Sequence, residues 1–220
     1  MNKSNPKKVK HFTESVPSEK IRSRKQQVVR DALIAAAEKL FRTRDFESVT
    51  VEEIAHAAGV SRRTFFRYFK SKEDVMVERS NQMDNKLIVE LTARPPDEPP
   101  LLAIRNTLVP TIISNLEDPE YMRSTIRMLR ETPSIRRALM ERRNRIEERI
   151  AALLAQRLNT AADDNTPMLL AFLMRALHDA ALNSWYDYET DDIAGLVDGL
   201  VNKLCDITAE YPRDSNAQNS

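Results

Sequence analysis

The chain has 220 residues, of which 41% are hydrophobic and 30% charged, so it is long enough for one large or two small domains with a buried core. It contains 3 Gly and 11 Pro, and its long stretches of Ala, Leu, Arg and Glu favour helices over β-hairpins. No apolar run is long enough to predict a membrane span, and the polar N-terminus does not resemble a signal peptide. The single cysteine, Cys205, excludes an internal disulfide, and we expect a cytoplasmic protein that buries this thiol.

The net charge of +1 conceals an uneven distribution. Residues 1–72 contain 17 Lys and Arg against 8 Asp and Glu, whereas residues 73–220 contain 17 against 25. A basic first third before an acidic remainder is typical of a polyanion-binding module attached to a second unit. A solvated basic tail would give part of the same imbalance, because lysines cluster near the N-terminus.

The N-terminal third predicts a tail and four helices. Residues 1–20 lack apolar periodicity and predict a disordered basic tail. Apolar residues at helical spacing then predict a helix over about 22–43. Capping and turn signals predict shorter helices over about 50–57 and 61–67, and a fourth that continues from Ser71 to about 92.

The stretch from Arg94 to Pro100 contains four prolines and is the clearest break in composition, so it predicts a stiff linker. Beyond it the pattern remains helical. Further helices are expected over about 101–116, from Pro119, over 133–158, over 167–188 and over 191–210. The sequence therefore predicts an all-α protein without strands.

Residues 50–69 have the length and punctuation of a helix-turn-helix. Thr50 and Glu53 form a predicted capping box, and Gly59 stands where a sharp turn between helices needs a left-handed residue. Ser61 is the predicted cap of the second helix, whose outer face carries arginines, a hydroxyl and aromatic rings. These residues are Arg62, Arg63, Thr64, Phe66, Arg67 and Tyr68.

This chemistry suits a reader of the DNA major groove. Arginine can donate two hydrogen bonds to guanine, and the thymine methyl group accepts apolar contact. Ser61, Lys72 and the helix N-termini suit phosphates, which position a protein without reading sequence. Packing in the small core is the alternative for Phe66, and a solvated surface position is the alternative for Arg67.

The run from Ala32 to Val75, ALIAAAEKLFRTRDFESVTVEEIAHAAGVSRRTFFRYFKSKEDV, resembles the DNA-binding domain of the tetracycline-repressor (TetR) family. The matching features are AAEKLF, Phe46, TVEEIAHAAGVS, TFFRYF and SKED, in that order and spacing. They cover about a fifth of the chain. The resemblance places base contacts on Arg62, Arg63, Thr64, Phe66 and Arg67, and phosphate contacts on Thr50, Tyr68 and Lys72. Phe66 and Arg67 stand where many members have Tyr-x-His, so no operator sequence carries over.

The resemblance also implies a fold of about nine helices and a homodimer that binds a palindromic operator in double-stranded DNA. It implies a C-terminal domain that dimerises and binds a small apolar or amphipathic effector, usually coupled to repression. The expected organisation is a tail (1–20), a three-helix helix-turn-helix domain (21–72), a connecting helix (73–93), a ligand-binding and dimerisation domain (94–212) and a second disordered tail (213–220).

A basic segment, residues 20–25, precedes this domain. Such an arm could reach into the adjacent minor groove, or it could serve only as a solubilising tail. Deletion of residues 1–20 tests the tail before it, because an unchanged operator affinity and salt dependence would reject a role for that tail.

The last two predicted helices are strongly apolar along one stripe each, and could pair with their copies in a four-helix dimer interface. Burial within one chain is the alternative. The residues expected at this interface are Ala181, Trp185, Leu196, Leu200 and Leu204.

An effector pocket is expected between the helices of residues 101–188. Methionines and aromatic rings accept varied apolar guests, although the same residues also serve as ordinary core. The candidate lining residues are Met122, Met128, Leu129, Phe172, Met174, His178, Trp185 and Tyr186. Arg127, Arg130 and Arg175 could meet an anionic group if they face inward.

Nothing in the sequence predicts an enzyme, a metal site or a cofactor. The 3 His are dispersed, no HExxH or CxxC motif occurs, and 3 Gly cannot form a glycine-rich phosphate loop. The sequence therefore predicts a ligand-responsive repressor. The alternatives are an activator without a small ligand, or a DNA-bound protein that recruits a protein partner through its C-terminal domain.

Overall fold

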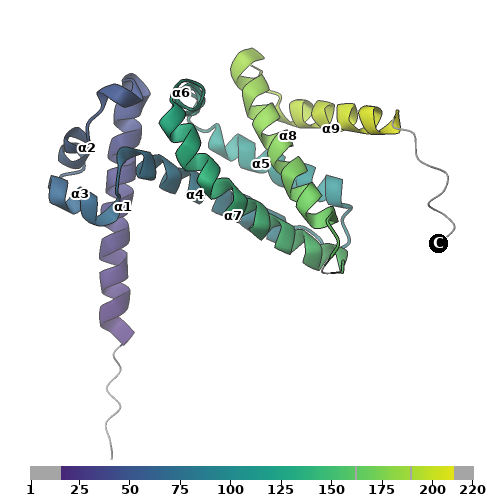
Figure 1. Ribbon diagram of the computed structural model, residues 1–220, viewed down its shortest axis with the longest axis horizontal. Coiled ribbons are helices and arrows are strands. Elements are labelled where there is room, and N and C mark those ends of the chain that lie inside the picture. The colour runs from purple at the N-terminus through teal and green to yellow at the C-terminus, as the bar shows by residue number, and fades with distance from the viewer. Residues whose placement is uncertain (1–15, 162, 189, 211–220) are drawn as a thin grey trace, which may run out of the picture.

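The computed structural model describes residues 16–161, 163–188 and 190–210, and within them the chain is helical without any strand (Figure 1). This confirms the predicted all-α fold. The segments are α1 (Val16–Thr43), a 3-10 helix η1 (Phe46–Ser48), α2 (Val51–Ala57), α3 (Arg62–Tyr68), α4 (Lys72–Ala93), α5 (Pro100–Asn115), α6 (Pro119–Glu131), α7 (Pro133–Leu158), α8 (Thr166–Tyr188) and α9 (Ile193–Ala209).

Local chemistry determines where most of these helices begin. The side chains of Thr50, Ser61 and Ser71 each accept a hydrogen bond from a backbone N–H in the first turn, as the sequence predicts. Proline opens α5, α6 and α7, where its missing N–H would have no partner in the helix. The short helix η1 was not predicted from the sequence.

The N-terminal prediction is wrong at its boundary. Helix α1 begins at Val16, so residues 16–20 are helical rather than part of a disordered tail. The basic segment 20–25 is also helical, and an α-helix about 10 Å wide does not enter a minor groove about 6 Å wide. The predicted tails over residues 1–15 and 213–220 lie outside the described residues.

Helices α1, α2 and α3 form the head, with α2 and α3 against the C-terminal half of α1 (Figure 1). Their apolar faces meet in a core of which Phe41, Phe46 and Phe65 are the largest fully buried side chains. Burial of one such ring contributes about 1.5–3 kcal/mol, so a few of them can hold a small three-helix unit together.

Helices α4 to α9 form the body around a second apolar core. Helices α7 and α8 run side by side, and α9 extends beyond the other helices toward the C-terminus (Figure 1). Cys205 lies exposed on α9, which corrects the expectation of a buried thiol. No helix in the described part of the chain is long and apolar enough to cross a bilayer.

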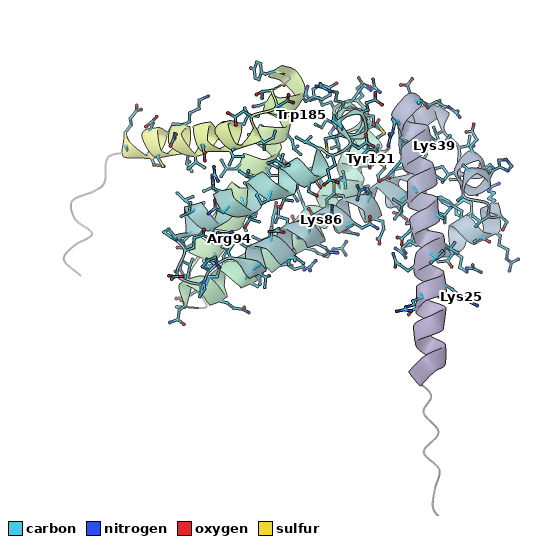
Figure 2. All side chains as sticks on the ribbon, turned by 180° about the vertical axis from the view of Figure 1, so that it is seen from behind. Lys25, Lys39, Lys86, Arg94, Tyr121 and Trp185 are labelled. Carbon is cyan, nitrogen blue, oxygen red and sulfur yellow. The ribbon has the colours of Figure 1, made fainter. Side chains whose placement is uncertain are left out.

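The head and the body share a packed joint. Met128 at the end of α6 and Ile135 at the start of α7 are buried in the core of the head. Figure 2 shows Tyr121 of α6 where the body meets α1, and Lys25 on the part of α1 that extends beyond the head. Helix α4 begins directly after α3 and runs into the body, so it connects the two units covalently.

Candidate functional site

The turn between α2 and α3 has the geometry of a helix-turn-helix. Thr50 and Glu53 form the full capping box, with the Glu53 carboxylate accepting from the Thr50 backbone N–H at 2.9 Å. Gly59 adopts φ +70°, a left-handed conformation that suits glycine, and the Val60 N–H donates to the Ala55 carbonyl at 2.9 Å. These bonds hold α3 at a fixed angle to α2.

Helix α3 buries one face and exposes the other. Phe65 is fully buried, whereas Phe66 beside it is 46% exposed and meets the Phe65 ring edge-on at 5.5 Å between centroids. Phe66 is therefore not part of the core of the head. Arg62, Arg63 and Arg67 are exposed on the same helix, and Thr64 and Tyr68 are half-buried.

The three arginines differ in how they are held. The Arg62 guanidinium forms an ion pair at 2.9 Å with Glu52 of α2, a contact that the sequence did not predict. The Arg67 guanidinium lies 5.1 Å from the centre of the Tyr68 ring. No hydrogen bond or ion pair holds Arg63 within the described part of the chain, so its guanidinium is presented to solvent.

Two of the expected phosphate contacts are engaged within the head. The Lys72 ammonium donates to the carbonyls of Phe46 at 2.6 Å and Val49 at 3.1 Å, and its side chain is only 16% exposed. The Thr50 hydroxyl donates to Glu53 at 2.9 Å. Their contacts with phosphate remain predictions, and the observed bonds give Lys72 a structural role in holding η1 against α4.

Ion pairing also determines the ionisation of Glu53. Hydrogen bonds from Arg44 first, and then from Thr50, lower the pKa of this carboxyl to about 2. Glu53 is therefore ionised near neutral pH, and its carboxylate maintains the capping box at the start of α2.

The body contains a cavity of about 550 Å³, within the usual range for small-molecule sites. All five helices from α4 to α8 contribute to its wall. The apolar part of the wall consists of Met83, Leu87, Met122, Ile126, Leu129, Leu139, Met140 and Leu182. The charged part consists of Arg130, Arg136, Arg142, Arg143, Arg175, Asp84 and Asp179, with His178 beside them.

Three of the eight predicted pocket residues line this cavity, namely Met122, Leu129 and His178. The other five do not line it. Met128 packs in the core of the head, Met174 and Trp185 are buried in the core of the body, and Phe172 is 51% exposed on the outside of α8. The Tyr186 ring packs under the guanidinium of Arg130 at 4.6 Å.

The polar residues of the cavity tie α4 to α7. Arg142 of α7 is only 6% exposed and donates hydrogen bonds to Ser80, Asn81 and Asp84 of α4. Burial first, and then the charges of nearby Arg175 and Arg145, lower the pKa of Arg142 to about 10. Asp84 and Arg142 are not recognisable as a pair in the sequence, because only the packing of α4 on α7 brings them together.

The expected dimer residues fall into two groups. Ala181 is fully buried and Trp185 is 4% exposed within this chain, so neither is available to a second copy, which corrects that expectation. Leu196, Leu200 and Leu204 of α9 are half-buried, and Ile207 is 68% exposed. Figure 2 shows Trp185 on α8 near the start of α9.

Comparison with known proteins identifies both units. The profile of bacterial regulatory proteins of the tetR family matches residues 33–78, which cover most of the head. The profile of the MftR C-terminal domain matches residues 98–209, which is half of the chain. The chain belongs to the TetR family.

One TetR-family relative is the HTH-type transcriptional regulator TcmR of Streptomyces glaucescens, which is 30% identical over 184 residues, covering 80% of this chain and 81% of TcmR. Among solved structures, NalD, the secondary repressor of the MexAB-OprM multidrug efflux pump in Pseudomonas aeruginosa, is 23% identical with a TM-score of 0.57, over 83% of this chain and 96% of NalD. Thermus thermophilus FadR in complex with lauroyl-CoA is 24% identical with a TM-score of 0.53, over 87% of this chain and 100% of FadR.

These matches make the chain a helix-turn-helix transcriptional regulator of the TetR family. The regulator relatives point away from an enzyme, and within the described residues no group of three or more His, Cys, Asp or Glu side chains could hold a metal ion.

Proposed function

We propose that this TetR-family regulator is a homodimeric repressor whose operator affinity is controlled by a small effector bound in the body. The observation that carries the proposal is the path of α4. This helix follows the exposed face of α3 directly in sequence, and four of its residues, Ser80, Met83, Asp84 and Leu87, form part of the cavity wall. A movement of α4 at the cavity wall would therefore be transmitted to the head.

The DNA contacts follow from the exposed face of α3. Arg62, Arg63, Thr64, Phe66 and Arg67 would face the bases, and Ser61, Tyr68, Thr50 and Lys72 would contact the backbone. Support for this comes from the exposure of the three arginines and Phe66. An arginine that grips guanine contributes about 1–3 kcal/mol of discrimination, so two or three such contacts account for a specific site.

The proposed homodimer uses the apolar outer faces of α8 and α9. Leu169 is 66% exposed, Phe172 51% and Ile207 68%, and such large apolar side chains on adjacent helices favour association. Two heads related by a twofold axis would bind a palindrome with half-sites about 34–36 Å apart.

The cavity volume and the solved structure of FadR with lauroyl-CoA support the effector part of the proposal, although FadR is similar only in fold. A filled core with an exposed apolar groove would instead have favoured a DNA-bound protein that recruits a protein partner.

Selection of bound DNA from a random pool tests the proposal. The full chain is expected to enrich one palindromic sequence, and a band-shift titration is expected to show two chains per site. Enrichment of no sequence, or of a single half-site by one chain, would contradict the proposed function.

A further inference from the structure

The cavity contains more positive charge than its own carboxylates balance. Five arginines line it against two aspartates. Arg142 is paired with Asp84, and Arg143 with Asp179 at 2.9 Å. Arg130 is paired at 2.7 Å with Asp187, which lies outside the lining. An excess of positive charge therefore remains inside the cavity.

Arg136 donates to the carbonyls of Leu129 and Arg130, which leaves Arg175 on α8 as the lining arginine without a hydrogen bond among the described residues. The Arg175 guanidinium lies 3.9 Å from Asp84 and 3.9 Å from Asp179, too far for a hydrogen bond to either. No closer acceptor is found among the residues that the structure describes, although the side chain is only 20% exposed. A partly buried guanidinium without a hydrogen bond is costly, and it can donate two parallel bonds to a carboxylate.

Asp179 does not provide this partner. Burial opposes its ionisation, but His178 and two arginines hold the pKa of its carboxyl below the usual range. Asp179 is thus already ionised and shared among its neighbours.

Apolar side chains form most of the rest of the wall, from Met83 on α4 to Leu182 on α8, and four neutral polar residues complete it: Ser80, Thr111, Asn115 and Asn183. A ligand that fits both parts has an apolar body and an acidic group. A cationic ligand would be repelled by the arginines, and a neutral apolar ligand would leave Arg175 without a partner.

We propose that the cavity binds an amphipathic organic anion, whose acidic group pairs with Arg175 and competes with Asp84 for the arginines of the cavity. The proposal specifies the effector class of the proposed function and rests on it.

The competition explains how such a ligand acts on the head. Asp84 lies on α4 and is the ionised partner through which Arg142 holds that helix to α7. Arg142 is buried and repelled by Arg175, so an added negative charge stabilises both guanidiniums and makes Asp84 dispensable. The ionic tie between α4 and α7 is then weakened, although Arg142 still donates to Ser80 and Asn81, and the affinity for the operator falls.

The test uses three probes with one apolar chain and different head groups: decanoate, decan-1-ol and decylamine. Each is titrated into the full-length protein near neutral pH and followed by calorimetry. Decanoate is expected to bind about tenfold or more tightly than the other two, because only it forms a charge-assisted pair. Equal binding of the alcohol or the amine, or no binding of decanoate, overturns the proposal.

Arg175→Gln is the decisive variant, and Arg137→Gln is its control, because Arg137 is exposed on α7 and does not line the cavity. Arg175→Gln is expected to lower decanoate affinity about tenfold and to leave decan-1-ol affinity unchanged. Arg137→Gln is expected to match the wild type. If Arg175→Gln leaves decanoate affinity unchanged, the acidic group binds elsewhere, and its proposed pairing with Arg175 is overturned.

Asp84→Asn tests the link to DNA, since it keeps an acceptor oxygen for Arg142 while removing the charge. It is expected to bind decanoate more tightly and to bind the operator more weakly without any ligand. Unchanged operator affinity in a folded Asp84→Asn protein contradicts the competition.

If this variant does not fold, the Arg175 titrations still decide the ligand class. Failure of the wild type to select any DNA sequence rejects the proposed function separately, because the probe titrations contain no DNA.

Discussion

The guanidinium of Arg79 on α4 lies 2.6 Å from the carboxylate of Glu38 on α1, so an ion pair joins the helix that enters the body to the longest helix of the head. The ring of Tyr121 on α6 lies 5.7 Å from the Arg79 guanidinium. Three helices thus meet at one polar group of the joint. The Tyr121 hydroxyl is buried and has no hydrogen-bond partner in the part of the chain described.

We expect Tyr121→Phe to leave the free energy of unfolding unchanged or to raise it by about 1 kcal/mol, because it removes a buried hydroxyl that forms no hydrogen bond. Urea unfolding of the variant against the wild type measures this. Tyr188→Phe is the matched control, since Tyr188 is 78% exposed. A loss of more than about 1 kcal/mol would show that the hydroxyl has a partner, such as a bound water.

The same tyrosine gives a pH dependence. Burial, and to a lesser degree the charge of Glu38, raise the pKa of Tyr121 from 10.0 to about 12. The folded chain therefore keeps this proton when the unfolded chain loses it. The contribution to stability is fully present below about pH 10 and is lost as the pH rises toward 12. Phenolate absorbance should show one tyrosine that titrates late, and Tyr121→Phe should remove it.

Lys72→Ala should destabilise the head by about 2 kcal/mol, because a largely buried ammonium donates to two carbonyls of the η1 segment. Thermal unfolding measures the loss, and Lys70→Ala, an exposed neighbour, is the control. If Lys72 also contacts phosphate, the variant will bind every DNA sequence more weakly and its salt dependence will decrease by about one released ion. An unchanged melting temperature would contradict the structural role.

Arg67→Ala should lower specific affinity by about 1–3 kcal/mol and affect non-specific affinity less, because an arginine on the outer face of α3 is expected to read a base. The measurement is a pair of binding titrations, one with the selected operator and one with unrelated DNA. Arg137→Ala removes the same charge from the body and controls for net charge. Equal losses on both DNAs would assign Arg67 to the phosphate backbone.

Glu52→Gln should strengthen operator binding by two- to fivefold, equivalent to about 0.5–1 kcal/mol. The substitution releases Arg62 from its ion pair and removes a negative charge from the surface that faces the phosphates. Fluorescence anisotropy at low salt gives the affinity, with Glu90→Gln on α4 as a control distant from α3. Weaker binding would mean that Glu52 orients Arg62 toward its base.

Leu200→Asp should dissociate the homodimer, because it places a charge in the proposed apolar interface of α9. Sedimentation velocity should show a monomer, and operator affinity should fall because a single head reads only half of the palindrome. Asn202→Asp adds the same charge to another, exposed position of α9 and should remain a dimer. A Leu200→Asp protein that remains dimeric would place the interface elsewhere.

The helix-turn-helix could be predicted in detail, because its capping and turn signals are local. Thr50, Gly59 and Ser61 act within one or two turns of their own helices, so the sequence alone is enough to place them. Helix α7 was predicted at its observed bounds, since a proline opens it and a polar loop follows it. The start of α1 was not predicted, because residues 16–20 lack the apolar stripe by which a packed helix is recognised.

The cavity could not be predicted to the same degree, because it depends on which way each helix face turns. Met122 and Met128 lie on one helix, yet the first lines the cavity and the second enters the core of the head. Asp84 and Arg142 are far apart in the sequence and look like ordinary surface charges until α4 packs on α7. The sequence shows that methionines and arginines are available, but tertiary packing determines which of them line the cavity.

Helix α4 is a single unbroken rod of 22 residues, about 33 Å long at 1.5 Å per residue. Asp84 sits near its middle, about 18 Å from its first residue. A tilt of about 10° around that point would carry the start of the helix, and α3 with it, by about 3 Å. Exchange of one ionic partner inside the cavity would in this way displace α3 by a distance comparable to the rise between adjacent base pairs.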